Sequence, residues 1–475
     1  MLFNSLEFLI FFLIVVVTYF SIPHKYRWSL LLILSCIFYI SFIPIYIFVL
    51  FFLITIDYFA GIFIEKSEGK KRKIFLIISI ISTSSALFFF KYFNFFSYNL
   101  ENLSKLIGWN YSPLILSLAL PIGLSFHTFQ SLSYVIEVYR GRQKAEKNFG
   151  IYALYVMFFP QLVAGPIERP YNLLHQFYEE HKFEFNRIID GLGLMIWGFF
   201  KKIVVADRLA AVVNIVYGDT VAYQGTPLIL ATFFFAFQIY YDFSGYSDIA
   251  IGSARVLGFN LMRNFNRPYF SKSIPEFWKR WHISLSTWFR DYVYIPLGGN
   301  RVPIHLFYFN LFVVFLLSGL WHGANWTFVM WGFLNCIYII LFFMTQKIRE
   351  RIFPESKLYN IISIIFTFIL VGFGWIFFRA NNISEAFFII TNLFSRINLN
   401  IFNMDLKVSK ANLLLSFTLI FFIEFVHYLQ EKDIDIKKKF LSLPRIIRWG
   451  IYLIFILIIL LFGVFKNMQF IYFQF

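Results

Sequence analysis

Apolar runs of about 20 residues recur from one end of the chain to the other, and they constrain its fold more than any other feature. A helix of that length crosses the ~30 Å hydrocarbon core of a bilayer. Only helices and closed barrels pair every backbone polar group inside that core, and runs this long and apolar exclude a barrel. The sequence therefore predicts an all-α integral membrane protein.

The composition agrees with a membrane protein, because only 14% of the residues are charged and the mean hydropathy is +0.69, whereas a soluble domain carries about a quarter charged residues. The predicted spans lie near 3–22, 28–43, 45–64, 74–96, 113–136, 190–216, 227–250, 305–321, 325–345, 359–378, 411–429 and 449–465. Since Lys201 and Lys202 interrupt one run, 190–216 is either a span or an interfacial helix followed by a short span. We expect about 11–13 transmembrane helices, with 151–165 as a re-entrant segment too short to cross. No soluble domain or repeat is evident, so 1–475 is predicted to form one membrane domain.

Basic residues give the chain a formal net charge of +16, and they gather in short loops between the predicted spans. Cytoplasmic loops of membrane proteins are rich in Lys and Arg, so this pattern indicates topology and not a nucleic-acid partner. If the basic loops face the cytoplasm, both termini lie outside the cell. The loops concerned are 25–27, 66–73, 140–147, 260–301, 347–351 and 432–448.

Neither a disulfide framework nor a metal site is expected. Cys36 and Cys336 are the two cysteines of the chain, and each lies inside an apolar run. The histidines form no HxxxH pair or cluster with cysteine. Residues 3–22 lack a basic leading region, so we interpret them as a first span and not as a cleaved signal.

The loop 273–290 has the pattern of an amphipathic helix. Ser273 and Glu276 form a capping box, and Glu276 can pair with Arg280 one turn later. Apolar residues then recur at helical spacing, namely Trp278, Trp281, Leu285 and Trp288. Indoles favour the headgroup boundary, so we expect one helix lying at the cytoplasmic interface. His282 flanks this aromatic seam, either as a hydrogen-bonding member of the seam or as a functional residue near a cytoplasmic site.

The motif SGLWHGANW (318–326) places a histidine and an asparagine between two apolar runs. Polar side chains at membrane depth are costly, so His322 and Asn325 mark a candidate functional site. Gly319 and Gly323 permit close backbone approach. The alternative is that His322 makes a hydrogen bond between helices.

Other polar residues occur in apolar surroundings. Gln161 lies within the short run 151–165, and Asp242 and Ser244 lie in QIYYDFSGYSD (238–248). These residues are suited either to line a water-filled tunnel or to pack as polar pairs between helices.

Four stretches carry a family resemblance: FFPQLVAGPIERP (158–170), YYDFSGYSDIAIGSARVLGF (240–259), NRPYFSKSIPEFWKRWHISLSTWFRDYVYIPLGGNR (266–301) and SGLWHGANWTFVMWG (318–332). Together they resemble the membrane-bound O-acyltransferase (MBOAT) superfamily, and in particular its bacterial alginate and peptidoglycan O-acetyltransferase branch. The resemblance implies a ring of helices around a central tunnel. It implies that His322 is the catalytic residue and that His282 is a second functional position. The supporting or tunnel-lining residues that we expect are Trp321, Asn325, Asp291, Arg290, Trp281, Asp242, Ser244 and Gln161.

The chain ends FIYFQF (470–475), which fits the pattern F-x-Y-x-x-F. The related D-alanyl exporters of teichoic acids resemble this chain around both histidines, but there the pattern belongs to a separate small protein. A fused motif is more like the acetyltransferase branch and makes Tyr472 a candidate acyl carrier. The alternative is an aromatic anchor at the interface.

The resemblance thus implies acetyl transfer from a cytoplasmic donor, such as acetyl-CoA or another acetyl thioester, with no permanently bound cofactor and no metal. The expected partners are an extracytoplasmic acetyltransferase protein and a polysaccharide such as peptidoglycan or alginate, in a bacterial cytoplasmic (inner) membrane. A D-alanyl or lipid acyltransferase, or a transporter without enzymatic activity, is the alternative. An adjacent base such as His322 is needed if Tyr472 is acylated, since a phenol has a pKa near ~10.

Overall fold

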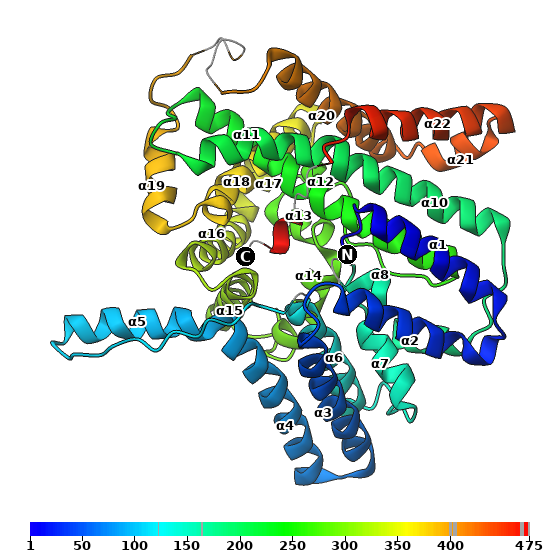
Figure 1. The fold of residues 1–475 in the computed structure, drawn as a ribbon. Coiled ribbons are helices and arrows are strands. Elements are labelled where there is room, and N and C mark those ends of the chain that lie inside the picture. Colours follow the sequence, from blue (N-terminus) through cyan, green and yellow to red (C-terminus); the bar gives the residue numbers. More distant parts are fainter. Residues whose placement is uncertain (122, 163–164, 399–400, 402–405, 466–469, 474–475) are drawn as a thin grey trace. The chain divides into compact units, whose positions relative to one another are not determined.

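The computed structural model describes residues 1–475 apart from 122, 163–164, 399–400, 402–405, 466–469 and 474–475 (Figure 1). Every regular element in the described residues is a helix, which confirms the predicted all-α class. The chain divides into two compact units, Met1–Met195 with Ile249–Met262, and Ile196–Asp248 with Arg263–Phe475. The single-domain organisation stays a prediction, and each unit is described by itself.

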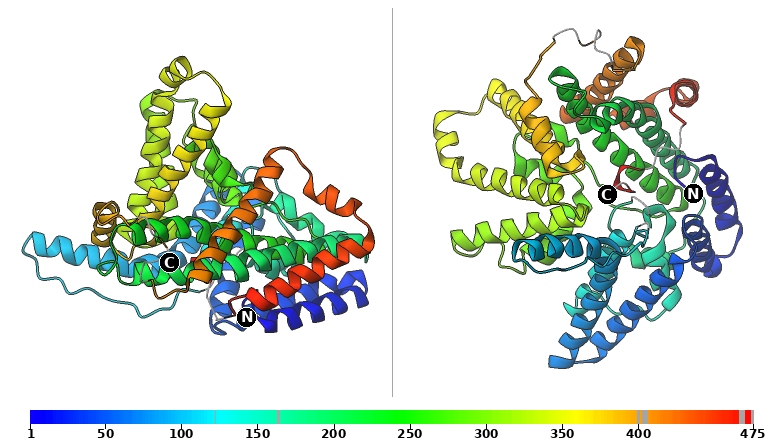
Figure 2. Two further views of the ribbon diagram at one scale, coloured as in Figure 1. Left: turned by 90° about the horizontal axis from the view of Figure 1, so that it is seen from above. Right: turned by 60° about the vertical axis from the view of Figure 1, so that its left-hand side comes forward.

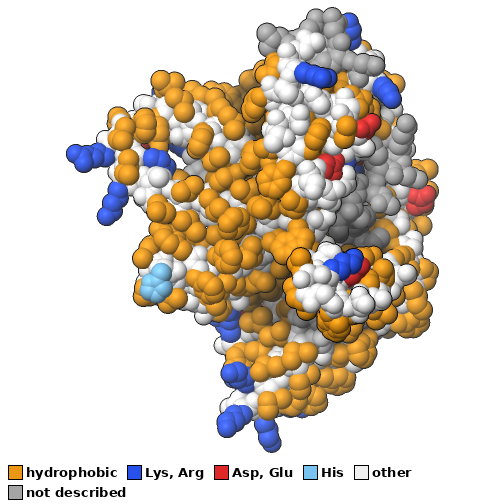
Figure 3. All heavy atoms as spheres, turned by 90° about the vertical axis from the view of Figure 1, so that its left-hand side faces the viewer, with side chains coloured by type: hydrophobic (Ala, Val, Ile, Leu, Met, Phe, Trp, Pro, Cys, Tyr) orange, Lys and Arg blue, Asp and Glu red, His pale blue; other side chains and the backbone are white. Residues whose placement is uncertain are grey.

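Eight helices in the described residues are long and apolar enough to span a membrane. They are Tyr46–Lys66, Gly69–Leu106, Thr226–Leu257, Ile304–His322, Trp326–Met344, Lys357–Arg379, Lys410–Glu431 and Arg445–Phe462. Most of these helices carry exposed apolar side chains, such as Ile361, Ile365 and Ile369 on one helix, whereas Thr226–Leu257 is largely buried. Hydrophobic side chains cover much of the face drawn in Figure 3. Such large apolar surfaces suit contact with lipid.

The first unit contains the helices α1 (Leu6–Ser21), α2 (His24–Ile40), α3 (Tyr46–Lys66), α4 (Gly69–Leu87), α5 (Phe93–Leu106), α6 (Leu124–Tyr139), α7 (Phe149–Met157), α8 (Phe159–Leu162) and α9 (Pro170–Leu173). The helices α3, α4 and α6 pack on one another around the buried Asp57. Its carboxylate accepts hydrogen bonds from Ser79 (2.5 Å), Thr83 (3.1 Å) and Ser131. A buried carboxylate needs such donors, so this cluster fixes the helix register.

The second unit contains α11 (Asp207–Gly218), α13 (Ile274–Arg280), α14 (Ile283–Phe289), α15 (Ile304–His322), α16 (Trp326–Met344), α17 (Gln346–Ile352), α18 (Lys357–Arg379), α19 (Ile383–Asn392), α20 (Lys410–Glu431), α21 (Ile436–Ser442), α22 (Arg445–Phe462) and the short turn η7 (Ile471–Phe473). The helices α10 (Phe185–Phe199) and α12 (Thr226–Leu257) have residues in both units. In Figures 1 and 2, α15, α16 and α18 stand side by side.

Glycines bring α15 and α16 into close contact, as predicted for Gly319. A Cβ on Gly319 would lie 2.3 Å from the carbonyl oxygen of Phe328, and one on Gly332 would lie 2.3 Å from that of Phe315. Gly323 is equally restricted, since a Cβ there would lie 2.2 Å from the ring of Phe328. The two helices therefore meet backbone to backbone, and this contact fixes the position of the turn between them.

Four predicted spans are not among these eight helices. Two of them, 3–22 and 28–43, form the shorter helices α1 and α2, of 16 and 17 residues. The stretch 113–136 is helical only from Leu124, because Pro113 and Pro121 interrupt the apolar run before it. The stretch 190–216 is part of one helical run, in which the π-helix η3 (Phe200–Ala206) joins α10 to α11. Lys201 and Lys202 lie buried in η3, which accounts for the basic pair inside an apolar sequence.

The expectation of one helix over 273–290 is wrong. Ser273 caps α13 and Glu276 pairs with Arg280 at 2.6 Å, as predicted, but α13 ends at Arg280 and α14 begins at Ile283. Trp281 is 1% exposed instead of lying at the headgroup boundary. Its ring packs 5.0 Å from that of Trp375, so tertiary packing overrides the helical periodicity.

Candidate active site

His282 lies in the break between α13 and α14, with a left-handed backbone (φ 41°, ψ 55°) that non-glycine residues rarely adopt. Asn264 holds this break. Its carbonyl accepts from the N–H of Ile283 (2.8 Å), its side-chain oxygen accepts from the Ser284 hydroxyl (2.7 Å), and its amide donates to Ser247 (3.2 Å). Strained backbone of this kind persists where surrounding contacts determine it, and it often occurs at functional sites.

The His282 ring is almost completely buried, with 1% of the residue exposed. It packs edge-on against Phe243 at 4.6 Å between ring centroids and lies 5.9 Å from Trp321. Burial lowers the pKa of His282 to about 3, so the imidazole is neutral at physiological pH.

His322 is the last residue of α15 and is 4% exposed. Its ring lies 4.8 Å from Trp321, 5.0 Å from Trp331 and 5.1 Å from Phe378, measured between ring centroids. These rings come from α15, α16 and α18, so the packing of three helices fixes the imidazole. His322 thus lies in an aromatic enclosure at a helix end.

Tyr472 lies in η7 at the end of the described chain, between the two histidines. Its ring centroid is 5.6 Å from His322 and 6.3 Å from His282, and it packs on Phe243 at 4.6 Å and on Phe378 at 6.3 Å. The tertiary structure therefore brings together the three residues that the sequence nominated as catalytic.

The phenol of Tyr472 is held in its neutral, protonated form. Its hydroxyl is buried, and within the described part of the chain it has no hydrogen-bond partner. Burial, together with the negative charge of Asp242, raises the pKa of Tyr472 above its ordinary value of about 10. The hydroxyl keeps its proton at neutral pH, so any reaction at this oxygen needs a neighbouring base. Phe475, the last residue of the motif, lies outside the described residues.

Asp242 attaches the end of the chain to this centre. Its Oδ2 accepts a hydrogen bond of 2.9 Å from the backbone N–H of Ile471, and its Oδ1 lies 2.7 Å from Nζ of Lys202. Lys202 also pairs with Asp207 at 2.8 Å. Sequence reasoning missed Lys202 and Asp207, although the basic pair inside an apolar run was the signal that could have found them.

The other predicted site residues lie at different distances from the two histidines and Tyr472. Trp321 lies against both histidines. Ser244 accepts a 3.0 Å hydrogen bond from Nζ of Lys201, whose other partner is Asp248 at 2.6 Å. Trp281 belongs to the neighbouring aromatic core.

Asn325 has a structural position, because its side chain caps α16 by accepting from the N–H of Thr327 (3.1 Å). Arg290 and Asp291 form a 2.8 Å ion pair, and Arg290 is 58% exposed. Gln161 belongs to the first unit, where it donates to the carbonyl of Tyr155 at 2.7 Å.

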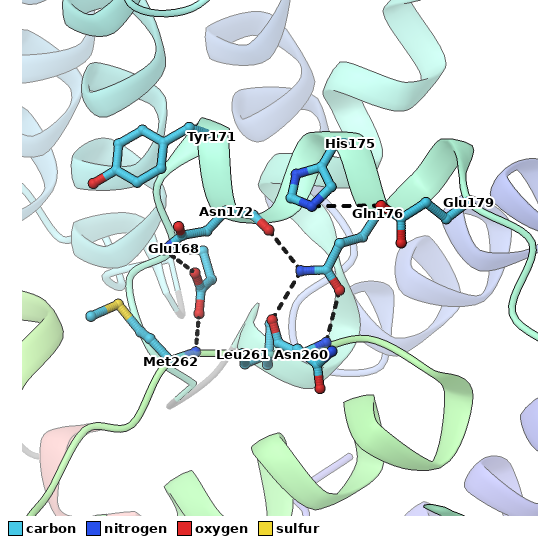
Figure 4. A pocket seen from close by; sticks show the side chains of 9 residues that line it. All are labelled: Glu168, Tyr171, Asn172, His175, Gln176, Glu179, Asn260, Leu261 and Met262. Atoms are coloured by element: carbon cyan, nitrogen blue, oxygen red, sulfur yellow. Dashed lines mark hydrogen bonds and ion pairs between the residues drawn. The ribbon is translucent and has the colours of Figure 1, made fainter.

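A separate pocket of about 400 Å³ lies in the first unit (Figure 4). Glu168 accepts a hydrogen bond from the N–H of Met262 at 2.6 Å. The side-chain amide of Gln176 donates to the carbonyl of Asn260 and accepts from its N–H. Burial raises the pKa of Glu168 to about 7. None of the candidate catalytic residues lines this pocket. In the residues that the structure describes, no group of three or more His, Cys, Asp or Glu side chains could hold a metal ion.

The helical fold defines a multi-pass membrane protein, and its candidate site combines two buried histidines with a tyrosine. The membrane-bound O-acyltransferase family model matches residues 148–380, which include both histidines. A probable alginate O-acetylase of Azotobacter vinelandii is 38% identical over 403 residues, covering 83% of this chain and 78% of the relative. One of Pseudomonas aeruginosa is 39% identical over 402 residues, covering 83% and 75%. The peptidoglycan O-acetyltransferase of Helicobacter pylori is 35% identical over 361 residues, covering 70% and 67%.

The chain therefore belongs to the membrane-bound O-acyltransferase family. It is an acyltransferase, and its similarity to these relatives assigns it as a membrane O-acetyltransferase.

Proposed function

We propose that this enzyme takes an acetyl group from a cytoplasmic thioester, most simply acetyl-CoA, and passes it through Tyr472 to an acceptor outside the cell. The observation that carries this proposal is the position of the Tyr472 ring, 5.6 Å from His322 and 6.3 Å from His282. A carrier hydroxyl and two candidate bases thus occupy one buried site. The names of the relatives, alginate O-acetylase and peptidoglycan O-acetyltransferase, support a polysaccharide as the final acceptor.

In the first transfer, the Tyr472 oxygen attacks the carbonyl carbon of the acetyl thioester while His322 accepts the phenolic proton. The carbon–sulfur bond then breaks, and the thiolate takes this proton and leaves as a free thiol. A neutral imidazole is suited to both proton transfers near pH 7. The product is an acetyl ester of Tyr472. His282 forms the second polar position beside the phenol, where it can orient the donor.

In the second transfer, a hydroxyl group attacks the tyrosyl ester and Tyr472 regains its proton. A phenolate leaves more readily than an aliphatic alkoxide because the pKa of a phenol is only ~10, so the ester is reactive. The attacking hydroxyl belongs to a separate extracytoplasmic acetyltransferase, which then acetylates the polysaccharide. The bacterial relatives support a cytoplasmic membrane, and the basic loops favour an orientation with both termini outside. In that orientation the C-terminal carrier would face the acceptor.

Mass spectrometry of the C-terminal peptide tests this route. Membranes receive acetyl-CoA labelled in the acetyl group, and the peptide that follows Lys466 is analysed after rapid acid quench. We expect label on Tyr472 in the natural chain and none in His322→Ala. His305→Ala is the matched control, because His305 lies in the same helix α15 but is exposed.

Acetylated polymer without label on Tyr472 would replace the relay with direct transfer. Label that appears in membrane lipid instead of polymer would make the enzyme a lipid acyltransferase. Label from an activated D-alanyl donor, with none from acetyl-CoA, would make it a D-alanyl transferase.

A further inference from the structure

We infer that the buried ion cluster of Lys202, Asp207 and Asp242 positions the C-terminal carrier, by holding the backbone of Ile471 so that Tyr472 lies between the two histidines. The catalytic meaning of this role rests on the proposed function, whereas the positioning itself can be measured without catalysis.

The cluster is unusually deep for three charged side chains. The side chains of Lys202, Asp207 and Asp242 are 1%, 3% and 4% exposed. Lys202 lies in the π-helix η3, and its Nζ contacts both carboxylates, at 2.8 Å and 2.7 Å. π-Helical turns are rare and frequently occur at functional sites. Because a buried charge without partners costs several kcal/mol, the three groups lock one another in place.

Asp207 and Asp242 have four carboxyl oxygens and share one ammonium group, so Lys202 does not supply a donor to every oxygen. The backbone N–H of Ile471 is a further donor to Asp242, at 2.9 Å. Hydrogen bonds to ionised acceptors are about twice as strong as neutral ones. The tail of the chain thus supplies a donor to Asp242, and the cluster fixes the tail.

Two further contacts attach the chain to the same elements before this point. The N–H of Val464 donates to the carbonyl of Ile203 in η3 at 3.0 Å, and Arg208 at the start of α11 donates to the carbonyl of Phe462 at 2.6 Å. After the residues 466–469, which are not described, the ring of Phe470 packs on Tyr246 at 4.5 Å. Helix η3 and its neighbours therefore hold the tail on both sides of that gap.

Lys202 and Asp242 are positioning residues, because they act on Tyr472 through the backbone of Ile471. Tyr472 follows Ile471 directly and its hydroxyl makes no hydrogen bond in the described residues. Its placement by polar contacts thus depends on the bond to Asp242, while the surrounding rings supply apolar packing.

A cross-linking experiment measures the position of residue 472. In a chain with Cys36→Ser and Cys336→Ser, the substitutions Tyr472→Cys and Phe378→Cys place thiols at positions whose rings lie 6.3 Å apart. A short bis-maleimide then reports the fraction of chains in which residue 472 occupies the site. Membrane insertion is measured for each variant from its yield after extraction.

Ile471→Pro removes the N–H that Asp242 accepts, while proline is tolerated at the first position of a helical turn such as η7. We expect the cross-linked fraction to fall about tenfold, the ratio given by loss of one hydrogen bond to a charged group. Ile471→Ala is the matched control, since it removes the side chain, keeps the N–H and should retain the cross-link. An unchanged cross-link in Ile471→Pro would overturn the inference.

Substitutions at Asp242 separate the hydrogen bond from the charge. Asp242→Asn keeps an acceptor for Ile471 and leaves Lys202 and Asp207 as a balanced pair, so most of the cross-link should remain. Asp242→Leu removes the acceptor and should lose the cross-link. Equal cross-linking in the two variants would contradict the inference, and if Asp242→Leu fails to insert, the Ile471→Pro comparison decides.

Acetyl labelling of the chains with intact Tyr472 distinguishes the two proposals. A cross-link that depends on Ile471 and Asp242, with no acetyl on Tyr472 in the natural chain, supports the anchor and rejects the relay. Acetyl on Tyr472, with a cross-linked fraction that neither Ile471→Pro nor Asp242→Leu changes, supports the relay and rejects the anchor.

Discussion

The ring of Tyr472 lies 5.6 Å from the ring of His322, although the helices α16 to α22 separate the two residues along the chain. His322 ends a membrane helix and Tyr472 belongs to a short turn near the C-terminus. Their meeting places a protonated phenol beside an imidazole ring in an aromatic enclosure.

Substitution of His322 by alanine should lower acetyl transfer by about 10²–10⁴-fold, the usual contribution of a general base. Insertion into the membrane should not change, and His305→Ala in the same helix should keep full activity. Transfer of labelled acetyl to polymer in membranes measures the effect. Normal transfer by a well-inserted His322→Ala enzyme would remove His322 from the catalytic role.

Tyr472→Phe should abolish acetyl labelling of the C-terminal peptide with little loss of stability. The hydroxyl has no hydrogen-bond partner in the described chain, so its removal leaves no buried group unsatisfied. Tyr269→Phe is the contrasting control, because the Tyr269 hydroxyl donates to the carbonyl of Ala236 at 2.5 Å. Loss of this hydroxyl should lower the free energy of unfolding by about 1–3 kcal/mol. Denaturation in detergent compares the two variants. A large destabilisation by Tyr472→Phe would indicate a structural tyrosine.

The stability of the enzyme should fall in acid partly because of His282. Its pKa is about 3 in the folded protein and about 6.5 when unfolded, so below pH 6.5 the unfolded chain binds a proton that the folded one does not. The stabilisation is complete above pH 6.5 and is lost by about 1.4 kcal/mol per unit as the pH falls toward 3. Unfolding curves at several pH values, compared with those of His282→Gln, isolate this contribution. Parallel pH dependences in the two proteins would mean that His282 is protonated in the fold.

Gly319→Ala should disrupt the turn that carries His322. The added methyl group would lie 2.3 Å from the carbonyl oxygen of Phe328, and such overpacking costs about 1–3 kcal/mol. We expect lower stability and lower acetyl transfer together. In Gly372→Ala, where nothing lies within 4 Å of the new Cβ, stability should be unchanged or slightly higher. If the two variants were equally stable in detergent, the close contact of α15 with α16 at Gly319 would not be needed for stability.

The local pattern of the sequence predicted the class of fold and part of the site. Long apolar runs require helices in lipid whatever their packing, and the glycines beside His322 indicated a close helix contact that the structure confirms. Prediction failed where distant residues decide the backbone. Trp281 has helical spacing, yet packing against Trp375 and the bonds from Asn264 to the residues after His282 break the helix there.

The sequence by itself determined that this is a helical membrane protein of a known acyltransferase family, with His282, His322 and Tyr472 as its candidate catalytic residues. These properties follow from apolar run length and from motifs that are contiguous in the chain. Only the tertiary structure decided that the three residues meet, and that Lys202, Asp207 and Asp242 hold the end of the chain beside them. Contacts between residues so far apart depend on how helices pack, and the spacing of residues along one helix carries no information about its partners.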